Sequence, residues 1–114
     1  MLDLDESIIS ATIASSIGEI LSMRYKAYVE EMKPSEELLN KSGSLIAMVS
    51  AMVQQAETPF GDCSSIMIAY GKIQVLEIPI KNKHIIVALG TIPNAPALDI
   101  ANKVTKLATR LRSG

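Results

Sequence analysis

The chain has 114 residues and a mass of 12.3 kDa, which fits one domain with a single core of ordinary size. Hydrophobic residues make up 48% and charged residues 20%, which excludes a disordered chain. The net charge is -1, aromatic residues reach only 4%, and Trp is absent, so the composition argues against a nucleic-acid binder that stacks bases on aromatic rings.

The single cysteine, Cys63, has no partner for an internal disulfide, which is typical of a reducing compartment. The chain does not open with a charged stretch followed by a long apolar run. Charged residues also interrupt every apolar stretch before it reaches the length of a membrane span. We therefore expect a cytoplasmic protein that does not insert into a membrane.

Residues 8–27 are predicted to form a β-hairpin after a short acidic lead-in over residues 1–7. β-Branched residues dominate the first half, Gly18 suits the turn, and apolar and polar side chains alternate from Leu21 to Ala27. A helix remains an alternative, because four isoleucines also fall at helical spacing, namely Ile9, Ile13, Ile17 and Ile20.

Residues 34–61 are predicted to form a helix that opens near Pro34. Between residues 43 and 53 its only polar side chains are two serines, so it lacks the charged stripe of a helix that covers one side of a sheet. This pattern predicts a second partner, most simply another copy of the chain. A helical segment at residues 8–27 would instead cover that face within one chain. The residues expected to end the helix are Thr58, Pro59 and Gly61.

Three strands are predicted next, over residues 64–70, 73–80 and 84–89. Short turns join them into an antiparallel meander, and Pro79 must lie near a strand end or a bulge because it cannot donate a ladder hydrogen bond. A second, amphipathic helix is predicted over residues 97–112. Its expected apolar face consists of Leu98, Ala101, Val104, Leu107, Ala108 and Leu111.

Catalytic and metal-binding patterns are missing from the sequence. His84 is the only histidine, and catalysis or metal binding needs partners at defined spacing. Cys63 is interpreted as a small apolar residue that enters a strand. The acids of the lead-in lack the spacing of a calcium loop and are expected to be solvated, and the glycines are too isolated for a phosphate-binding loop. We expect no enzyme, no metal and no cofactor.

The predicted order β-β-α-β-β-β-α resembles the roadblock (dynein light-chain type) family, which is related in architecture to longins and profilins. The family usually has a helix before the first hairpin, for which the lead-in is too short, and often an Asp in the hairpin turn, where Ser15 and Ser16 stand. Four segments carry the resemblance: ATIASSIGEILSM, LIAMVSAMVQQAE, VLEIPIKNKHIIVALG and TIPNAPALDIANKVTKLATRL.

The resemblance implies an α+β fold in which a five-stranded antiparallel sheet carries a central helix on one face and a C-terminal helix. It implies a non-enzymatic dimer, formed with itself or with a paralogous roadblock protein. Such a platform engages a Ras-like small GTPase or a larger assembly. The alternative is a sensor that binds a small molecule between sheet and helix. The expected dimer interface, along the central helix and the third strand, comprises Leu38, Ser42, Leu45, Val49, Met52, Ile66, Ile68 and Tyr70.

Independently of the resemblance, residues 63–71 carry no charge and no Pro. If the third strand lies at a sheet edge, that edge is unguarded and open to another strand. The opposite edge is predicted to be the strand with Arg24 and Lys26, which is guarded by charge.

Overall fold

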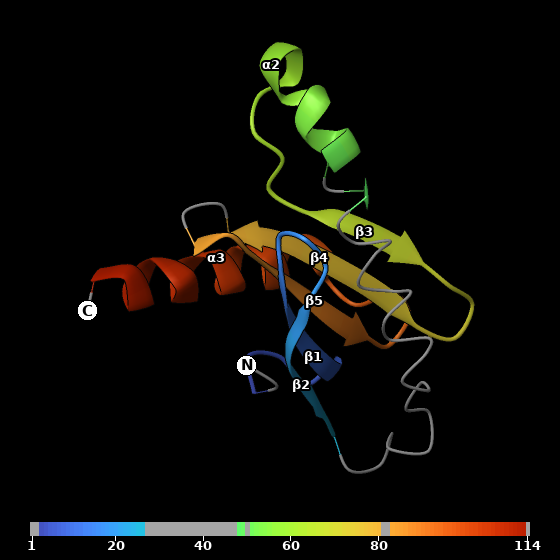
Figure 1. Cartoon of the computed structure of the whole chain (residues 1–114). Coiled ribbons are helices and arrows are strands. Elements are labelled where there is room, and N and C mark those ends of the chain that lie inside the picture. The colour runs from blue at the N-terminus through green and yellow to red at the C-terminus, as the bar shows by residue number, and fades with distance from the viewer. Residues whose placement is uncertain (1–2, 27–47, 50, 81–82, 114) are drawn as a thin grey trace.

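The computed structural model of the protein describes residues 3–26, 48–49, 51–80 and 83–113. Its strands form one antiparallel sheet in the spatial order β2-β1-β5-β4-β3 (Figure 1). The predicted α+β class and five-stranded antiparallel sheet are therefore confirmed. The elements in chain order are β1 (Ile8–Ser15), β2 (Ile20–Tyr25), α2 (Glu57–Phe60), β3 (Ile66–Ala69), β4 (Gln74–Ile80), β5 (Ile85–Thr91) and α3 (Ala97–Ser113).

The first two strands form the predicted hairpin, so a helix over residues 8–27 is excluded. Its turn is closed by two backbone hydrogen bonds, from Ser15 N–H to the Glu19 carbonyl (2.8 Å) and from Gly18 N–H to the Ser15 carbonyl (3.0 Å). Gly18 has a φ of 95°, which a residue with a side chain rarely adopts. The alternation along β2 therefore outweighed the helical spacing of the isoleucines.

The strand that begins the chain lies inside the sheet, between β2 and β5. Ala11 pairs with Leu89 and Ile13 with Val87, so the first and the last strand of the sequence pair side by side within the sheet. This placement leaves β2 and β3 as the two edges. Pro79 pairs with Ile86 one residue before β4 ends. It lies beyond the point where β3 stops, so its missing N–H breaks no bond to that strand.

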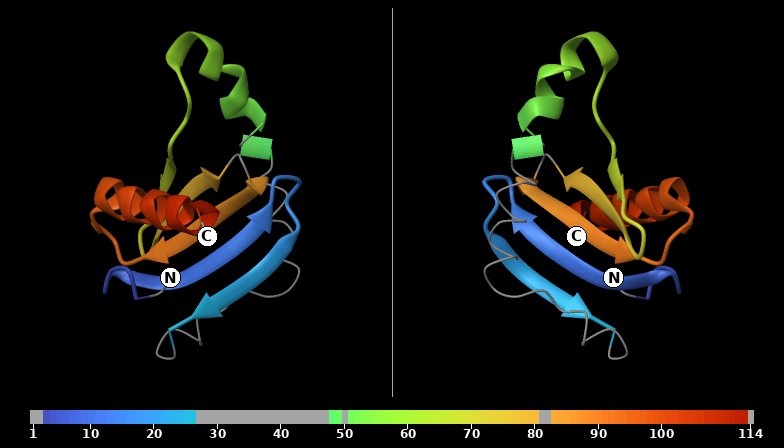
Figure 2. Two further views of the ribbon diagram at one scale, coloured as in Figure 1. Left: turned by 90° about the vertical axis from the view of Figure 1, so that its left-hand side faces the viewer. Right: turned by 90° about the vertical axis from the view of Figure 1, so that its right-hand side faces the viewer.

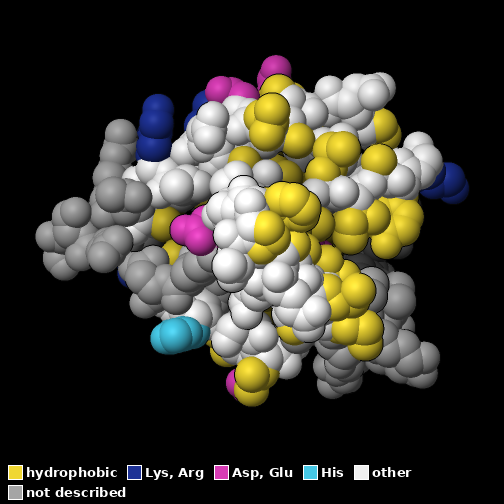
Figure 3. All heavy atoms as spheres, turned by 90° about the horizontal axis from the view of Figure 1, so that it is seen from above, with side chains coloured by type: hydrophobic (Ala, Val, Ile, Leu, Met, Phe, Trp, Pro, Cys, Tyr) yellow, Lys and Arg dark blue, Asp and Glu magenta, His cyan; other side chains and the backbone are white. Residues whose placement is uncertain are grey.

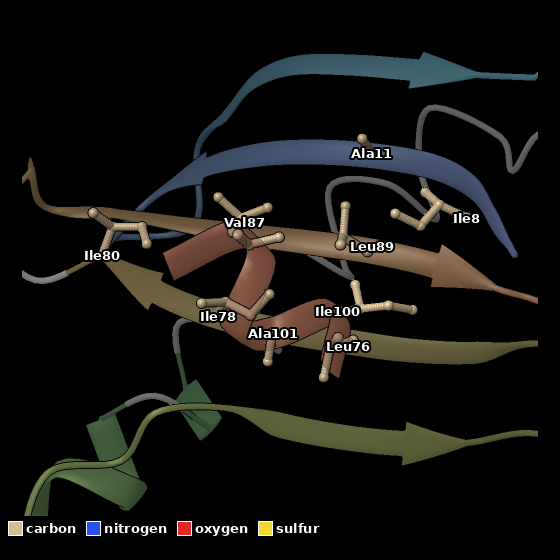
Figure 4. Packing of buried hydrophobic residues seen from close by; sticks show 10 residues of the cluster. Ile8, Ala11, Leu76, Ile78, Ile80, Val87, Leu89, Ile100 and Ala101 are labelled. Carbon is tan, nitrogen blue, oxygen red and sulfur yellow. The ribbon is translucent and has the colours of Figure 1, made fainter. Parts of the chain in front are cut away.

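The main core lies between the sheet and α3, which crosses one face of the sheet (Figures 2 and 4). Ile100 and Val104 from α3 are almost fully buried against Leu76 and Leu89 from the strands. Burying side chains of this size contributes about 1.5–3 kcal/mol each. Buried strand residues that complete this core include Ile8, Ala11, Ile78, Ile80 and Val87.

The predicted apolar face of α3 is wrong at one position. Leu98 is 76% exposed, whereas Ile100, which the prediction omitted, is fully buried. Ile100, Ala101 and Val104 set the centre of the buried stripe, and Leu98 lies more than a quarter of a turn from that centre. The buried stripe of α3 is therefore shifted toward Ile100 and away from Leu98 relative to the prediction, while Ala101 and Val104 are buried as expected.

The acidic lead-in is docked against α3 and the core. Leu4 packs on the core, and the Asp5 carboxylate accepts hydrogen bonds from the N–H (2.9 Å) and hydroxyl (2.5 Å) of Ser7. Lys103 of α3 lies 3.7 Å from Asp5 and 3.3 Å from Asp99. The expectation that the lead-in acids are simply solvated is therefore wrong for Asp5.

Only the end of the predicted central helix falls within the described residues. Residues 48–49 and 51–55 are helical, the chain turns at Ala56, and α2 adds one further turn that ends at Gly61, with a φ of 87°. Thr58 and Pro59 lie inside α2 instead of ending the helix. Pro59 fits there because α2 is a single turn, and proline is tolerated in the first turn of a helix. Over the ranges given above, no helix is long and apolar enough to cross a membrane.

Candidate interaction surface at the β3 edge

The third strand forms one edge of the sheet and pairs only with β4. Tyr70 N–H donates to the Ile73 carbonyl at 2.8 Å and closes a two-residue turn. This bond fixes which residues of β3 have their backbone groups hydrogen-bonded to β4. In an antiparallel pair the bonded positions alternate, so Ile66 and Ile68 also bond to β4. The backbone N–H and C=O groups of Met67 and Ala69 therefore point outward, to the free side of the edge.

Side chains on this edge are apolar and half open to solvent. Met67 is 53% exposed and Tyr70 is 55% exposed, while Ile66 and Ile68 are half-buried. Figure 3, which views the molecule from the end that carries α2, shows hydrophobic side chains gathered near the middle of that face and charged groups mostly toward its margin. A strand with free backbone groups and no charged side chain is a template for another strand.

The helical residues before α2, together with the last residue of α2, add to the exposed apolar surface. Met48 is 60% exposed, Met52 is 65% exposed and Phe60 is 86% exposed, and Val49 is half-buried. Exposed apolar side chains that gather into one patch are typical of interaction surfaces. Three of the residues predicted for the dimer interface, Leu38, Ser42 and Leu45, lie outside the described residues.

The other edge of the sheet is charged, as predicted. Arg24 on β2 is exposed, and the Lys26 ammonium donates to the carbonyl of Glu6 at 3.0 Å. Leu21 is the one large apolar side chain of β2 that is exposed, at 53%. The prediction of one guarded and one unguarded edge is therefore confirmed, and β3 is the unguarded one.

Catalytic geometry is missing from the part of the chain that is described. It holds no group of three or more His, Cys, Asp or Glu side chains that would bind a metal. His84 is exposed with a φ of 54°, in the turn before β5. Cys63 is half-buried, and its thiol donates to the Ser65 carbonyl at 3.4 Å. Within the described ranges, no side chain is placed to serve either residue in acid–base or nucleophilic chemistry.

Several solved structures are similar to this fold. A roadblock/LC7 domain from Streptomyces avermitilis matches with a TM-score of 0.69 and 14% identity, over 94% of this chain and 84% of that one. A structure of MglB with a tetrameric arrangement matches with a TM-score of 0.71 and 16% identity, over 91% and 74%. Gliding protein MglB from Thermus thermophilus matches with a TM-score of 0.68 and 15% identity, over 89% and 74%.

The chain has the roadblock fold. No protein-family model and no curated protein matches the sequence. The structural matches establish the roadblock architecture of the chain. At sequence identities this low they do not establish its role, which has to be argued from its own surface.

One residue of this roadblock sheet stands out, and no sequence pattern predicted its burial. Glu77 lies in the middle of β4, directly opposite Ile66 of β3 and Ala88 of β5. It is only 3% exposed, and its Oε2 atom has no hydrogen-bond partner among the described residues. Burial raises the pKa of the Glu77 carboxyl. The available signal was a single acid between the apolar residues of VLEIPI.

The face of the sheet that holds Glu77 is the one opposite α3. Residues directly opposite each other in a sheet share a face, so Ile66, Glu77 and Ala88 lie together on that side. Leu76 and Leu89, one residue along, lie on the α3 side. Ile86 and Ala88 form a second small buried cluster on the Glu77 face. The roadblock sheet is therefore apolar on both faces, with one carboxylate embedded in the second.

Proposed function

We propose that the protein is a non-enzymatic platform that dimerises through its β3 edge and, as a dimer, binds a Ras-like small GTPase or a larger assembly in the cytoplasm. The observation that carries the proposal is the uncharged β3 edge, with outward backbone groups at Met67 and Ala69 and exposed side chains at Met67 and Tyr70. A second copy supplies an identical edge, which an antiparallel two-fold arrangement pairs with the first.

Three further observations support this function. The exposed Met48 and Met52 lie on the helical segment that, by the family resemblance, is expected to share an interface with β3. Self-association has a parallel in the MglB structure with a tetrameric arrangement, which shares the fold. The lone Cys63, not used in any disulfide framework, fits a reducing compartment. The GTPase as partner rests on the family resemblance of the sequence segments.

The dimer is tested with a matched pair of variants, Met67→Asp on β3 and Leu21→Asp on β2. Both side chains are 53% exposed and lie on opposite edges of the sheet. In sedimentation velocity at micromolar concentration, we expect the wild type and Leu21→Asp to be dimers and Met67→Asp to be a monomer. A charge buried without a partner at the seam costs several kcal/mol, enough to dissociate the pair.

Circular dichroism of Met67→Asp checks that the monomer is folded. A wild-type chain that sediments as a monomer at these concentrations contradicts the dimer. For the partner, the wild type and Met67→Asp are used as baits in the source organism, and a GTPase found by mass spectrometry is purified and titrated in its GDP and GTP-analogue forms. We expect it to bind the wild type and Leu21→Asp, and to lose affinity for Met67→Asp.

A further inference from the structure

Two polar groups near the β3 edge, one buried and one exposed, make no hydrogen bond to the described residues of one subunit. Among the described residues, the buried Oε2 atom of Glu77 has no hydrogen-bond partner, and neither has the Tyr70 hydroxyl, which lies on a 55% exposed side chain in contact with solvent. One is an acceptor and the other a donor. An unpaired buried carboxylate is costly, so a donor supplied by a partner would relieve that cost only in the assembled state.

The phase of the β3 ladder limits how two copies can pair. The outward groups belong to Met67 and Ala69, so a two-fold axis must bring these positions into bonded pairs. A two-fold axis through Ile68 places the outward backbone groups of both strands in hydrogen-bonded pairs along the whole strand. It bonds Met67 of each subunit to Ala69 of the partner subunit. It places Ile68 opposite its own copy.

This register sets Tyr70 of the partner subunit directly opposite Ile66. Ile66, Ile68 and Tyr70 alternate onto the face that holds Glu77, since Ile66 lies opposite Glu77 in the sheet. Tyr70 of the partner subunit, Ile66 and Glu77 then form one row across three strands. The outer two lie about 10 Å apart, twice the spacing between strands. A tyrosine and a glutamate are both long enough to meet over the residue between them.

We propose that the hydroxyl of Tyr70 in each subunit donates a hydrogen bond to the Glu77 carboxylate of the other subunit, across Ile66. This contact rests on the proposed β3 dimer and deepens it. By symmetry it occurs twice in the dimer. Pairing through backbone groups alone tolerates several registers, whereas a buried acceptor that one donor reaches selects a single register.

Disulfide cross-linking of single-cysteine variants tests the register of the two β3 strands directly, because only residues that lie opposite their own copy can form the bond. In a Cys63→Ser background, Met67→Cys, Ile68→Cys and Ala69→Cys are oxidised and run on non-reducing gels. We expect Ile68→Cys to form a disulfide-linked dimer, because directly opposed non-bonded residues lie about 4.5 Å apart at Cα. Cross-linking through Met67→Cys or Ala69→Cys instead shifts the axis by one residue and overturns the contact. The latter shift would bring Lys72, rather than Tyr70, opposite Ile66.

The contact itself is tested by a double-mutant cycle on the dimer dissociation constant, measured by sedimentation equilibrium. We expect Tyr70→Phe to weaken the dimer at least about tenfold, because it removes two hydrogen bonds to a carboxylate. In a Glu77→Leu background the same change is expected to have less than about a twofold effect. Tyr25→Phe, which removes a hydroxyl from the opposite edge strand, is the matched control and leaves the constant unchanged.

The outcomes separate this contact from the dimer on which it rests. A monomeric wild type refutes both. A wild-type dimer that is as tight after Tyr70→Phe refutes the contact and leaves the dimer standing. An equal loss from Tyr70→Phe in the wild-type and Glu77→Leu backgrounds also refutes it, because the hydroxyl then acts on some other group.

Discussion

Glu77 carries an ionisable carboxyl that is buried on an apolar face of the sheet. A carboxyl buried among apolar side chains prefers to be neutral, which is why burial raises the pKa of Glu77 above its ordinary value of 4.5. The raised pKa fixes the sign of the pH effect. The folded state binds the proton more tightly than the unfolded state, so Glu77 destabilises the subunit at neutral pH, and this penalty fades as the pH falls through the raised pKa.

Replacing the carboxyl therefore has a predictable effect on the isolated subunit. In a monomeric Met67→Asp background, we expect Glu77→Leu to raise the free energy of unfolding by about 1–3 kcal/mol at neutral pH. The gain should shrink as the pH is lowered toward 4.5, the ordinary value for a glutamate. Urea unfolding at both pH values measures it. A gain that stays constant over this pH range would show that the ionisation of Glu77 is not its source.

Between elements, β1 and β5 pair closely at Gly90, which lies opposite Ser10. A Cβ added at Gly90 would collide with the Ser10 hydroxyl and approach the Ile73 side chain at 3.2 Å. The pairing of β1 with β5 is irregular at this point, between Ile8 and Ser10. Only glycine lets the strand at the centre of the sheet pass this closely.

We expect Gly90→Ala to lower the free energy of unfolding by about 1–3 kcal/mol, the usual cost of overpacking. Ser10→Ala removes the colliding oxygen and should restore most of the loss in the double variant. Gly71→Ala is the control, because a Cβ there has no neighbour within 4 Å. Thermal unfolding compares the four proteins. If Ser10→Ala restores nothing, the loss arises from the backbone and not from this contact.

The sequence predicted the elements better than their partners. Alternation from Leu21 onward and the turn at Gly18 were local signals, and both were read correctly. The pairing of β1 with β5 joins the first strand to the last one, and no local sequence pattern predicts such a distant pairing. The uncharged character of the β3 edge could be predicted because it depends only on which residues the strand contains. Glu77 was missed because a single acid in a strand looks the same whether its face is open or covered.

At the scale of the whole molecule, the lead-in ties the start of the chain to its last helix. Asp5 is held by Ser7 and faces Lys103 of α3 at 3.7 Å. Hydrogen bonds from the Ser7 hydroxyl and N–H, with a smaller effect of Lys103, lower the pKa of Asp5. The folded state therefore favours the charged carboxylate. Its contribution is complete above the ordinary value of 3.8 and is lost as the pH falls through the lowered pKa.

Asp5→Asn should consequently destabilise the protein at neutral pH and loosen the lead-in. We expect faster amide hydrogen exchange at Ser7 and Ile8, which the lead-in turn protects through the Ser7 and Ile8 N–H bonds. Asp3→Asn, an exposed acid two residues earlier, is the control and should leave both measures unchanged. The difference between Asp5→Asn and the wild type should close in strong acid. If it persists there, the charge of Asp5 is not the cause.

The unequal edges of the sheet also govern how far assembly can proceed. A sheet with two receptive edges can add strands at both ends and grow without limit, as fibrils do. Here the β2 edge carries Arg24 and Lys26, and only β3 is receptive. Once two such edges have met, the joined ten-stranded sheet presents β2 at both ends. In the proposed dimer, growth would therefore stop at two subunits, because neither remaining edge is receptive to a further strand.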